Sequence, residues 1–180
     1  MQNWSFNLSN INVTEPAWYY PFYVTADPTN HLAAIVAMAD PNNTYSYLPG
    51  QLASYTVDSH GNLSTTSTAA NMPYTGVGAG CCFESSLNMS PSGKLLAVAG
   101  GGGLQIFHFN GAAPITHYSA VLTTAEIDRI HWDNSNHLFA LSDKTNKLYV
   151  FTVTPTTITK VAGSPFSIPA TPNALIVVPK

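Results

Sequence analysis

The chain has 180 residues, of which 45% are hydrophobic and only 8% are charged. Six Lys and Arg residues stand against nine Asp and Glu residues, which is too few to build the basic surface that nucleic acid requires. The longest apolar runs are too short for a helix to cross a bilayer, so no transmembrane segment is expected.

Thirteen Pro and twelve Gly residues, with many Ser, Thr and Asn, favour strands that are joined by frequent turns. No stretch keeps the 3.6-residue apolar period of an amphipathic helix. The sequence therefore predicts an all-β fold.

Residues 1–20 precede the first complete unit of an internal repeat. Positions 3–13 have the pattern of an outermost strand, and positions 14–20 are expected to form a loop. The segment lacks the basic start and the apolar centre of a secretory signal peptide. We expect it to be the end of a preceding part-unit.

The first complete unit is predicted at 21–76. Its four strands are expected at 21–25, 32–36, 51–57 and 63–68. A turn at 27–30 joins the first two strands, and the extra length of this unit is expected in loops at 40–49 and 71–80.

The second unit is predicted at 77–122 and the third at 123–169. The strands of the second are expected at 83–89, 95–99, 103–109 and 115–120. Those of the third are expected at 127–132, 138–142, 147–153 and 157–161. The last segment, 170–180, is assigned to a following unit, with its innermost strand at 174–178.

Three turns begin the repeat most clearly, at Asp27, Ser90 and Asp133. The fourth position of each turn is Asn, Gly and Asn, which are the residue types that accept a positive φ at a hairpin corner. The next position holds His31, Lys94 and His137, which we predict to be solvated turn residues.

Four strands that recur three times with turns between them predict a β-propeller. Three blades do not close a ring, because closed propellers have about 4–8. Either the chain is the C-terminal part of a longer propeller, or two copies assemble, or the two part-blades pair into a strained fourth blade. The first of these is the preferred interpretation.

A family resemblance rests on several of these segments. Ser-Pro-Ser-Gly-Lys-Leu-Leu-Ala-Val-Ala at 90–99 is followed by Leu-Gln-Ile-Phe-His-Phe at 104–109. Gly-Gln-Leu-Ala-Ser-Tyr-Thr-Val at 50–57 leads through a Gly-Asn turn into another strand, and the chain closes on Pro-Asn-Ala-Leu-Ile-Val-Val-Pro at 172–179. These segments resemble the repeat of the bacterial lactonase-like, YVTN-type seven-bladed propellers. The resemblance implies three C-terminal blades with flanking part-blades.

That family includes 6-phosphogluconolactonase-type hydrolases, a muconate-lactonising relative and secreted proteins without an assigned role. Its enzymes show a Pro-Arg-His stretch at an inner strand and a later Asn-Glu pair, and this sequence has neither. The nearest counterpart of the first is the stretch at 128–131, Asp-Arg-Ile-His.

Candidate site residues are those on the innermost strands and the loops that enter them, because these segments line the channel mouth of a propeller. A lactone hydrolase would use His131 or Glu84 as the base that activates water, and Arg129 to stabilise an oxyanion or to bind a substrate anion. The candidate ligand-binding residues are Glu126, Asp128, Trp18 and Tyr19.

The sequence favours a non-catalytic binding or scaffold module, outside the cytoplasm, for a protein or carbohydrate ligand. A lactonase-like hydrolase that uses Glu84, Arg129 and His131 is the alternative. A redox-associated propeller of the quinoprotein or haem-d1 type is a third reading, but no ligand set for a cofactor or a metal is visible in the sequence. No cofactor is therefore expected.

Overall fold

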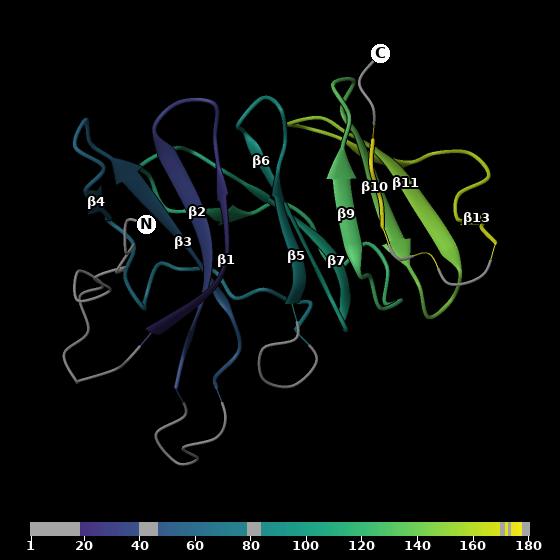
Figure 1. The fold of residues 1–180 in the computed structure, drawn as a ribbon, viewed down its shortest axis with the longest axis horizontal. Helices are drawn as coiled ribbons and strands as arrows, with labels where there is room; N and C mark the ends of the chain where they lie inside the picture. Colours follow the sequence, from purple (N-terminus) through teal and green to yellow (C-terminus); the bar gives the residue numbers. More distant parts are fainter. Residues whose placement is uncertain (1–18, 40–46, 79–83, 170–171, 173, 178–180) are drawn as a thin grey trace.

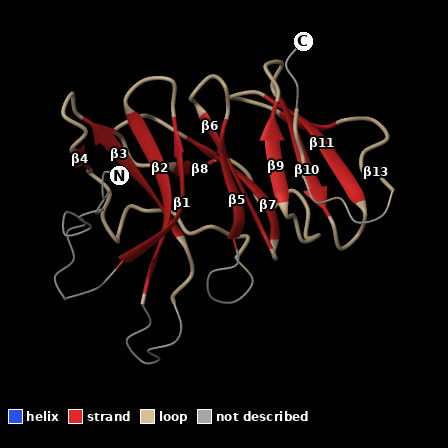
Figure 2. Cartoon of the chain, in the orientation of Figure 1, coloured by secondary structure: helices blue, strands red, loops and turns tan. Residues whose placement is uncertain are grey.

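The computed structural model describes residues 19–39, 47–78, 84–169, 172 and 174–177. These residues form thirteen strands and no helix (Figure 2), so the described chain holds no helix suited to crossing a membrane. The prediction of an all-β fold is confirmed for this part of the chain. The strand expected at 3–13 and the candidate Trp18 lie outside the described residues.

The strands form three antiparallel sheets, each a meander in sequence order, which stand side by side across Figure 1. Sheet 1 contains β1 (Tyr19–Ala26), β2 (His31–Met38), β3 (Gln51–Val57) and β4 (Leu63–Ser64). Sheet 2 contains β5 (Glu84–Met89), β6 (Leu95–Gly100), β7 (Gly103–His108) and β8 (Thr116–His117). Sheet 3 contains β9 (Arg129–Trp132), β10 (His137–Ser142), β11 (Lys147–Val153), β12 (Ile158–Lys160) and β13 (Phe166–Ser167).

The outer strands are shorter than the sequence predicts. The strand expected at 63–68 is reduced to the two residues of β4, and β8 has two residues and β12 three. Sheet 3 has one strand that the sequence does not predict, β13. It pairs with the start of β11, whereas β12 pairs with the end of β11. The inner strand expected at 174–178 is wrong for residues 174–177, which have no strand conformation; position 178 lies outside the described residues.

Beyond the end of each short outer strand, a serine hydroxyl accepts the hydrogen bond that a further residue of that strand would have accepted. In all three sheets, a backbone N–H of the third strand donates to a serine Oγ at 2.9–3.0 Å. The pairs are Ser54 with Ser67, Ile106 with Ser119, and Val150 with Ser164. The outer edge is thus held by the same side-chain bond three times.

The core lies between the sheets. In β6, Leu96 and Val98 pack toward sheet 1, whereas the alternate residues Leu95 and Ala97 pack toward sheet 3. We call the side of a sheet toward the next sheet in sequence its forward face, and the opposite side its rear face. The first strands are also neighbours, because β5 contacts both β1 and β9.

The repeated turns differ by one residue. The N–H of Asp27 donates to the carbonyl of His31, four residues on, but the N–H of Ser90 donates to that of Leu95, five residues on. The extra residue is Lys94, whose carbonyl accepts the N–H that directly follows β7, as the Asn30 carbonyl accepts the last N–H of β3. Lys94 therefore matches Asn30, and its predicted match with the histidines is wrong.

The expected left-handed backbone is present in two of the three turns. Gly93 has φ 67° and Asn136 has φ 65°. Asn30 is not among the described non-glycine residues with a positive φ, so the prediction fails there. The Asp27 turn closes with the same bond, from the Asp27 N–H to the His31 carbonyl, without a left-handed corner.

Candidate functional site

Glu84, at the start of β5, is enclosed between sheets 1 and 2. Glu84 is only 5% exposed, and its Oε1 accepts a hydrogen bond from the Thr75 hydroxyl. Two glycines leave room for the carboxylate: a Cβ on Gly50 would lie 2.5 Å from Oε1, and one on Gly78 would lie 3.1 Å away. The carboxylate is therefore packed between two sheets rather than presented on an open surface.

Arg129 and His131 lie on β9, two residues apart and hence on one side of that strand. Arg129 is exposed, and its Nη1 donates to the Asp128 carbonyl at 2.7 Å. The Nδ1–H of His131 donates to the Trp132 carbonyl at 2.7 Å. Each side chain is bonded to neighbouring backbone, and no hydrogen bond or ion pair of the described residues joins either one to Glu84. Their catalytic role stays a prediction.

Glu126 and Asp128 lie just before β9, beside the turn that follows β10. Asp128 accepts the N–H of Asp143 at 2.9 Å, and Lys144 pairs with Glu126 at 3.1 Å. Burial raises the pKa of the Asp128 carboxyl, and the nearby carboxylates of Asp143 and Glu126 raise it further, against the hydrogen bond from the Asp143 N–H. No cluster of three metal-ligating side chains is found in the described part of the chain.

Tyr19 is not an open ligand-binding residue. It is 5% exposed and belongs to the apolar cluster on the rear face of sheet 1. Its hydroxyl donates to Gln51 Oε1 over 3.4 Å, and burial raises its pKa, with Tyr74 adding to the shift. The sequence indicates that this aromatic segment is a candidate binding site, but it does not indicate which of its residues face solvent.

Three neighbours of Tyr19 on β1 are exposed aromatic residues. Tyr20 is 45% exposed, Phe22 39% and Tyr23 37%. Tyr47, from the far end of the β2–β3 loop, contacts two of them edge to face, with ring centroids 5.4 Å from Tyr20 and 5.3 Å from Phe22. We call these four residues the aromatic ledge. β1 forms one end of sheet 1, and its start runs out away from β5 in Figure 1.

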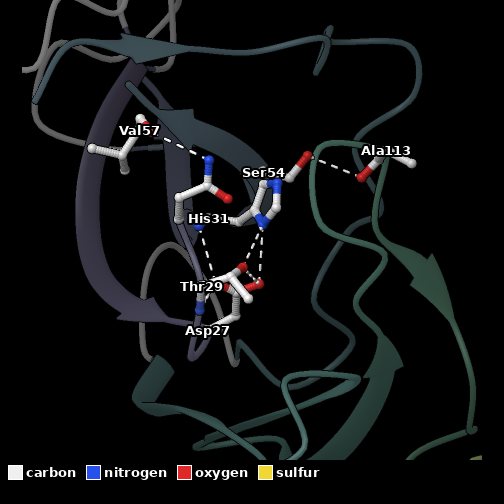
Figure 3. A network of polar contacts seen from close by, with 7 residues as sticks. Asp27, Thr29, His31, Ser54, Val57 and Ala113 are labelled. Carbon is white, nitrogen blue, oxygen red and sulfur yellow. Dashed lines mark hydrogen bonds and ion pairs between the residues drawn. The ribbon is translucent and has the colours of Figure 1, made fainter. Parts of the chain in front are cut away.

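A polar network at the opposite end of β1 is built on the turn at 27–31 (Figure 3). Asp27 Oδ1 accepts the N–H groups of Thr29 and His31 at 2.9 and 3.0 Å, and Oδ2 lies 3.0 Å from His31 Nδ1. Nearby, Ser54 Oγ donates to the Ala113 carbonyl of sheet 2's loop at 3.1 Å. His31 is therefore a paired turn residue, not the solvated one that the sequence predicts.

The same carboxylate–histidine arrangement recurs in the turn at 133–137. Asp133 Oδ1 accepts the N–H groups of Ser135 and His137 at 2.8 Å, and its Oδ2 lies 2.7 Å from His137 Nδ1. Because the arrangement repeats in two turns on different sheets, it is a structural motif of the turn rather than a catalytic pair.

No protein-family model matches the chain, and no curated protein matches it either. Among solved structures, it is similar to one described as the crystal structure of the eukaryotic initiation factor. The identity is 13%, the TM-score is 0.38, and the match covers 78% of this chain and 43% of that chain. A likeness this weak carries no argument about fold or function.

Proposed function

We propose that the chain is a run of β-propeller blades that serves as a non-catalytic binding module, and that the aromatic ledge is its ligand surface. Three successive antiparallel sheets, each with a four-strand meander, support the propeller, as do their adjacent first strands and the packing between successive sheets. Membership of the lactonase-like, YVTN-type family is part of this proposal.

The observation that carries the binding role is the exposure of the ledge. Three aromatic residues of β1, Tyr20, Phe22 and Tyr23, are each more than a third exposed. Tyr47 contacts two of them from the β2–β3 loop. Folded proteins leave clustered large apolar side chains open chiefly where a ligand or a partner binds. The ledge is also free of charged residues.

A neutral glycan fits the ledge best. The faces of aromatic rings carry partial negative charge, which attracts the polarised C–H groups of a sugar ring, and tyrosine hydroxyls can donate to or accept from sugar hydroxyls. Protein hot spots more often combine aromatics with Arg in a desolvated pocket. The ledge has no cation, so a protein ligand is the less favoured occupant. An extracytoplasmic location agrees with a glycan ligand and stays a prediction.

The hydrolase alternative has less support. Its proposed base, Glu84, is buried against Thr75 and two glycines, while Arg129 and His131 bond to their own neighbouring backbone. A water-activating base must reach the substrate directly or through one water. The described contacts offer no shared position where a lactone would meet all three side chains.

The test is a binding survey of the full chain against neutral oligosaccharides, followed by titration of any that bind. Tyr20→Ala with Phe22→Ala should weaken binding by about tenfold or more, which corresponds to the loss of stacking contacts. Phe166→Ala removes an aromatic that is 40% exposed on sheet 3 and serves as the matched control.

The proposal is overturned if no neutral glycan binds, or if the ledge variant binds as tightly as the wild type while keeping its circular dichroism spectrum. Binding of a defined protein with no glycan binding would also overturn it.

A further inference from the structure

The loop between β7 and β8 contains the one Asn-Gly pair of the sequence, Asn110 and Gly111. Asn110 is exposed, and in the described part of the chain its side-chain amide makes no hydrogen bond. Gly111 has φ 64° and no Cβ, so no side chain shields its backbone nitrogen. The Gly111 N–H donates to no described residue either. An amide carbon and the backbone nitrogen that can attack it are thus both unengaged.

The exposed asparagines of the repeated turns are held differently. After each of them, the N–H of the next residue donates to a turn carboxylate at 2.8–3.0 Å. The asparagines are Asn30, Asn134 and Asn136, and the carboxylates belong to Asp27 and Asp133. An N–H that donates to a carboxylate must give up that bond before its nitrogen attacks, which raises the barrier. This obstacle is missing at Gly111.

We infer that Asn110 is a site of spontaneous deamidation. The Gly111 nitrogen bonds to Asn110 Cγ, the Cγ–Nδ2 bond breaks, and ammonia leaves with the proton that the Gly111 nitrogen gives up. Water then opens the succinimide ring. Opening at Cγ gives aspartate, and opening at the backbone carbonyl gives isoaspartate, whose main chain runs through the side-chain carbon. In sum, one water is consumed and one ammonia is released.

The modified residue directly precedes a contact between sheets 1 and 2, part of which Figure 3 shows. Carbonyl groups of this loop accept hydrogen bonds from the hydroxyls of Thr66 and Ser54 at 2.8 and 3.1 Å. A Cβ on Gly111 would lie only 3.2 Å from the His31 ring. Isoaspartate adds one carbon to the main chain just before these contacts. Its formation therefore loosens the loop from sheet 1.

The experiment follows the full chain during incubation in mildly alkaline buffer at physiological temperature. Peptide mapping by mass spectrometry locates each amide that has become an acid, and an isoaspartate-specific methyltransferase counts the isoaspartate. Asn110 should convert about tenfold or more faster than Asn134, because the N–H after Asn134 must first leave its carboxylate. A conversion of Asn110 no faster than that of Asn134 overturns the inference.

Ser135→Gly is the matched control for the residue type that follows the asparagine. It gives Asn134 a glycine neighbour but keeps the Asp133 carboxylate that accepts the N–H of position 135. Asn134 should therefore still convert more slowly than Asn110 in this variant. Equal rates at the two sites would show that the dipeptide alone, and not the free N–H, decides the reaction.

The effect on the sheet contact is measured by thermal unfolding of samples taken during the incubation. Asn110→Ser cannot deamidate at this position and is incubated in parallel. The melting temperature of the wild type should fall as conversion proceeds, while that of Asn110→Ser stays constant. An unchanged melting temperature after full conversion of Asn110 would overturn the loosening of the loop.

Discussion

The turns at 27–31 and 133–137 have the same hydrogen bonds and different surroundings. In each, one carboxylate accepts two backbone N–H groups and pairs with a histidine. The side chains of Asp27 and His31 are 8% and 22% exposed, whereas those of Asp133 and His137 are 20% and 37% exposed. The local sequence determines the turn, but its burial depends on what lies beside it.

Sheet 2 lies beside the first turn. A Cβ on Gly93 would meet Pro28 Cδ at 2.7 Å, and one on Gly111 would meet the His31 ring at 3.2 Å. Two glycines of the next sheet thus let the first turn settle closely against it. We therefore expect substitutions that crowd the first turn or remove its hydrogen bonds to cost more stability than comparable substitutions at the second.

The largest effect is expected for Gly93→Ala. The new methyl would meet the ring of Pro28, and alanine at φ 67° is strained. Left-handed strain and overpacking together predict a loss of about 2–4 kcal/mol in the free energy of unfolding. Asn136→Ala, at φ 65° in the more open turn, should lose about 1 kcal/mol. Urea unfolding measures both, and equal losses would contradict the difference between the turns.

The next effect is expected for Asp27→Ala. It leaves the N–H groups of Thr29 and the part-buried His31 without their acceptor, with an expected loss of about 1.5–2.5 kcal/mol. Asp133→Ala makes the same change where water can replace the carboxylate, and should lose about 1 kcal/mol. Thermal unfolding of the pair at neutral pH provides the comparison. A larger loss for Asp133→Ala would show that exposure is not the deciding factor.

The Asp27 carboxylate should also make the stability of the protein depend on pH in acid. Burial acts to raise the pKa of Asp27, but the hydrogen bonds from His31 and Thr29 outweigh it and lower the pKa below its ordinary value of 3.8. The stabilisation is therefore present above pH 3.8 and is lost as the pH falls through the folded-state pKa. The urea midpoint of Asp27→Ala should fall less steeply than that of the wild type over this acidic range. Parallel curves would rule out a role for Asp27 in acid unfolding.

The smallest effect is expected for Thr66→Val. The Thr66 hydroxyl donates to the Ala112 carbonyl at 2.8 Å and so ties sheet 1 to the loop beneath His31. The bond is exposed, so its loss should cost about 0.5–1 kcal/mol. Tyr118→Phe removes the comparable bond from sheet 2 to the Thr154 carbonyl and should cost about as much. A loss in Thr66→Val as large as that in Gly93→Ala would mean that this tie, rather than close packing, holds the turn.

Much of the fold could be predicted because alternation and turn residues are local signals. The strands expected at 51–57 and 147–153 coincide with β3 and β11. The outer strands could not be delimited, since a serine side chain takes over from the ladder at a point that the sequence does not mark. The strand expected at 174–178 has the right residues, but a strand also needs a neighbour to pair with.

The candidate site was harder to predict because enclosure is a tertiary property. Nothing near Glu84 in sequence indicates that Gly50 and Thr75 close over its carboxylate. The aromatic segment was visible, yet Tyr19 and Tyr20 face opposite ways on β1 and only the second is open. Tyr47 completes the ledge from a distant part of the chain, and no local pattern points to it.

The serine bonds at the outer edges bear on how the protein behaves at high concentration. An edge strand whose amides are unpaired is a template on which strands of other molecules can pair and aggregate. The hydroxyls of Ser67, Ser119 and Ser164 each accept a hydrogen bond from a third-strand N–H just past the short outer strand. That N–H is therefore not available to pair with another molecule. We therefore expect that removing these three hydroxyl groups, in a chain with so few charges, would promote edge-to-edge pairing of the sheets of different molecules.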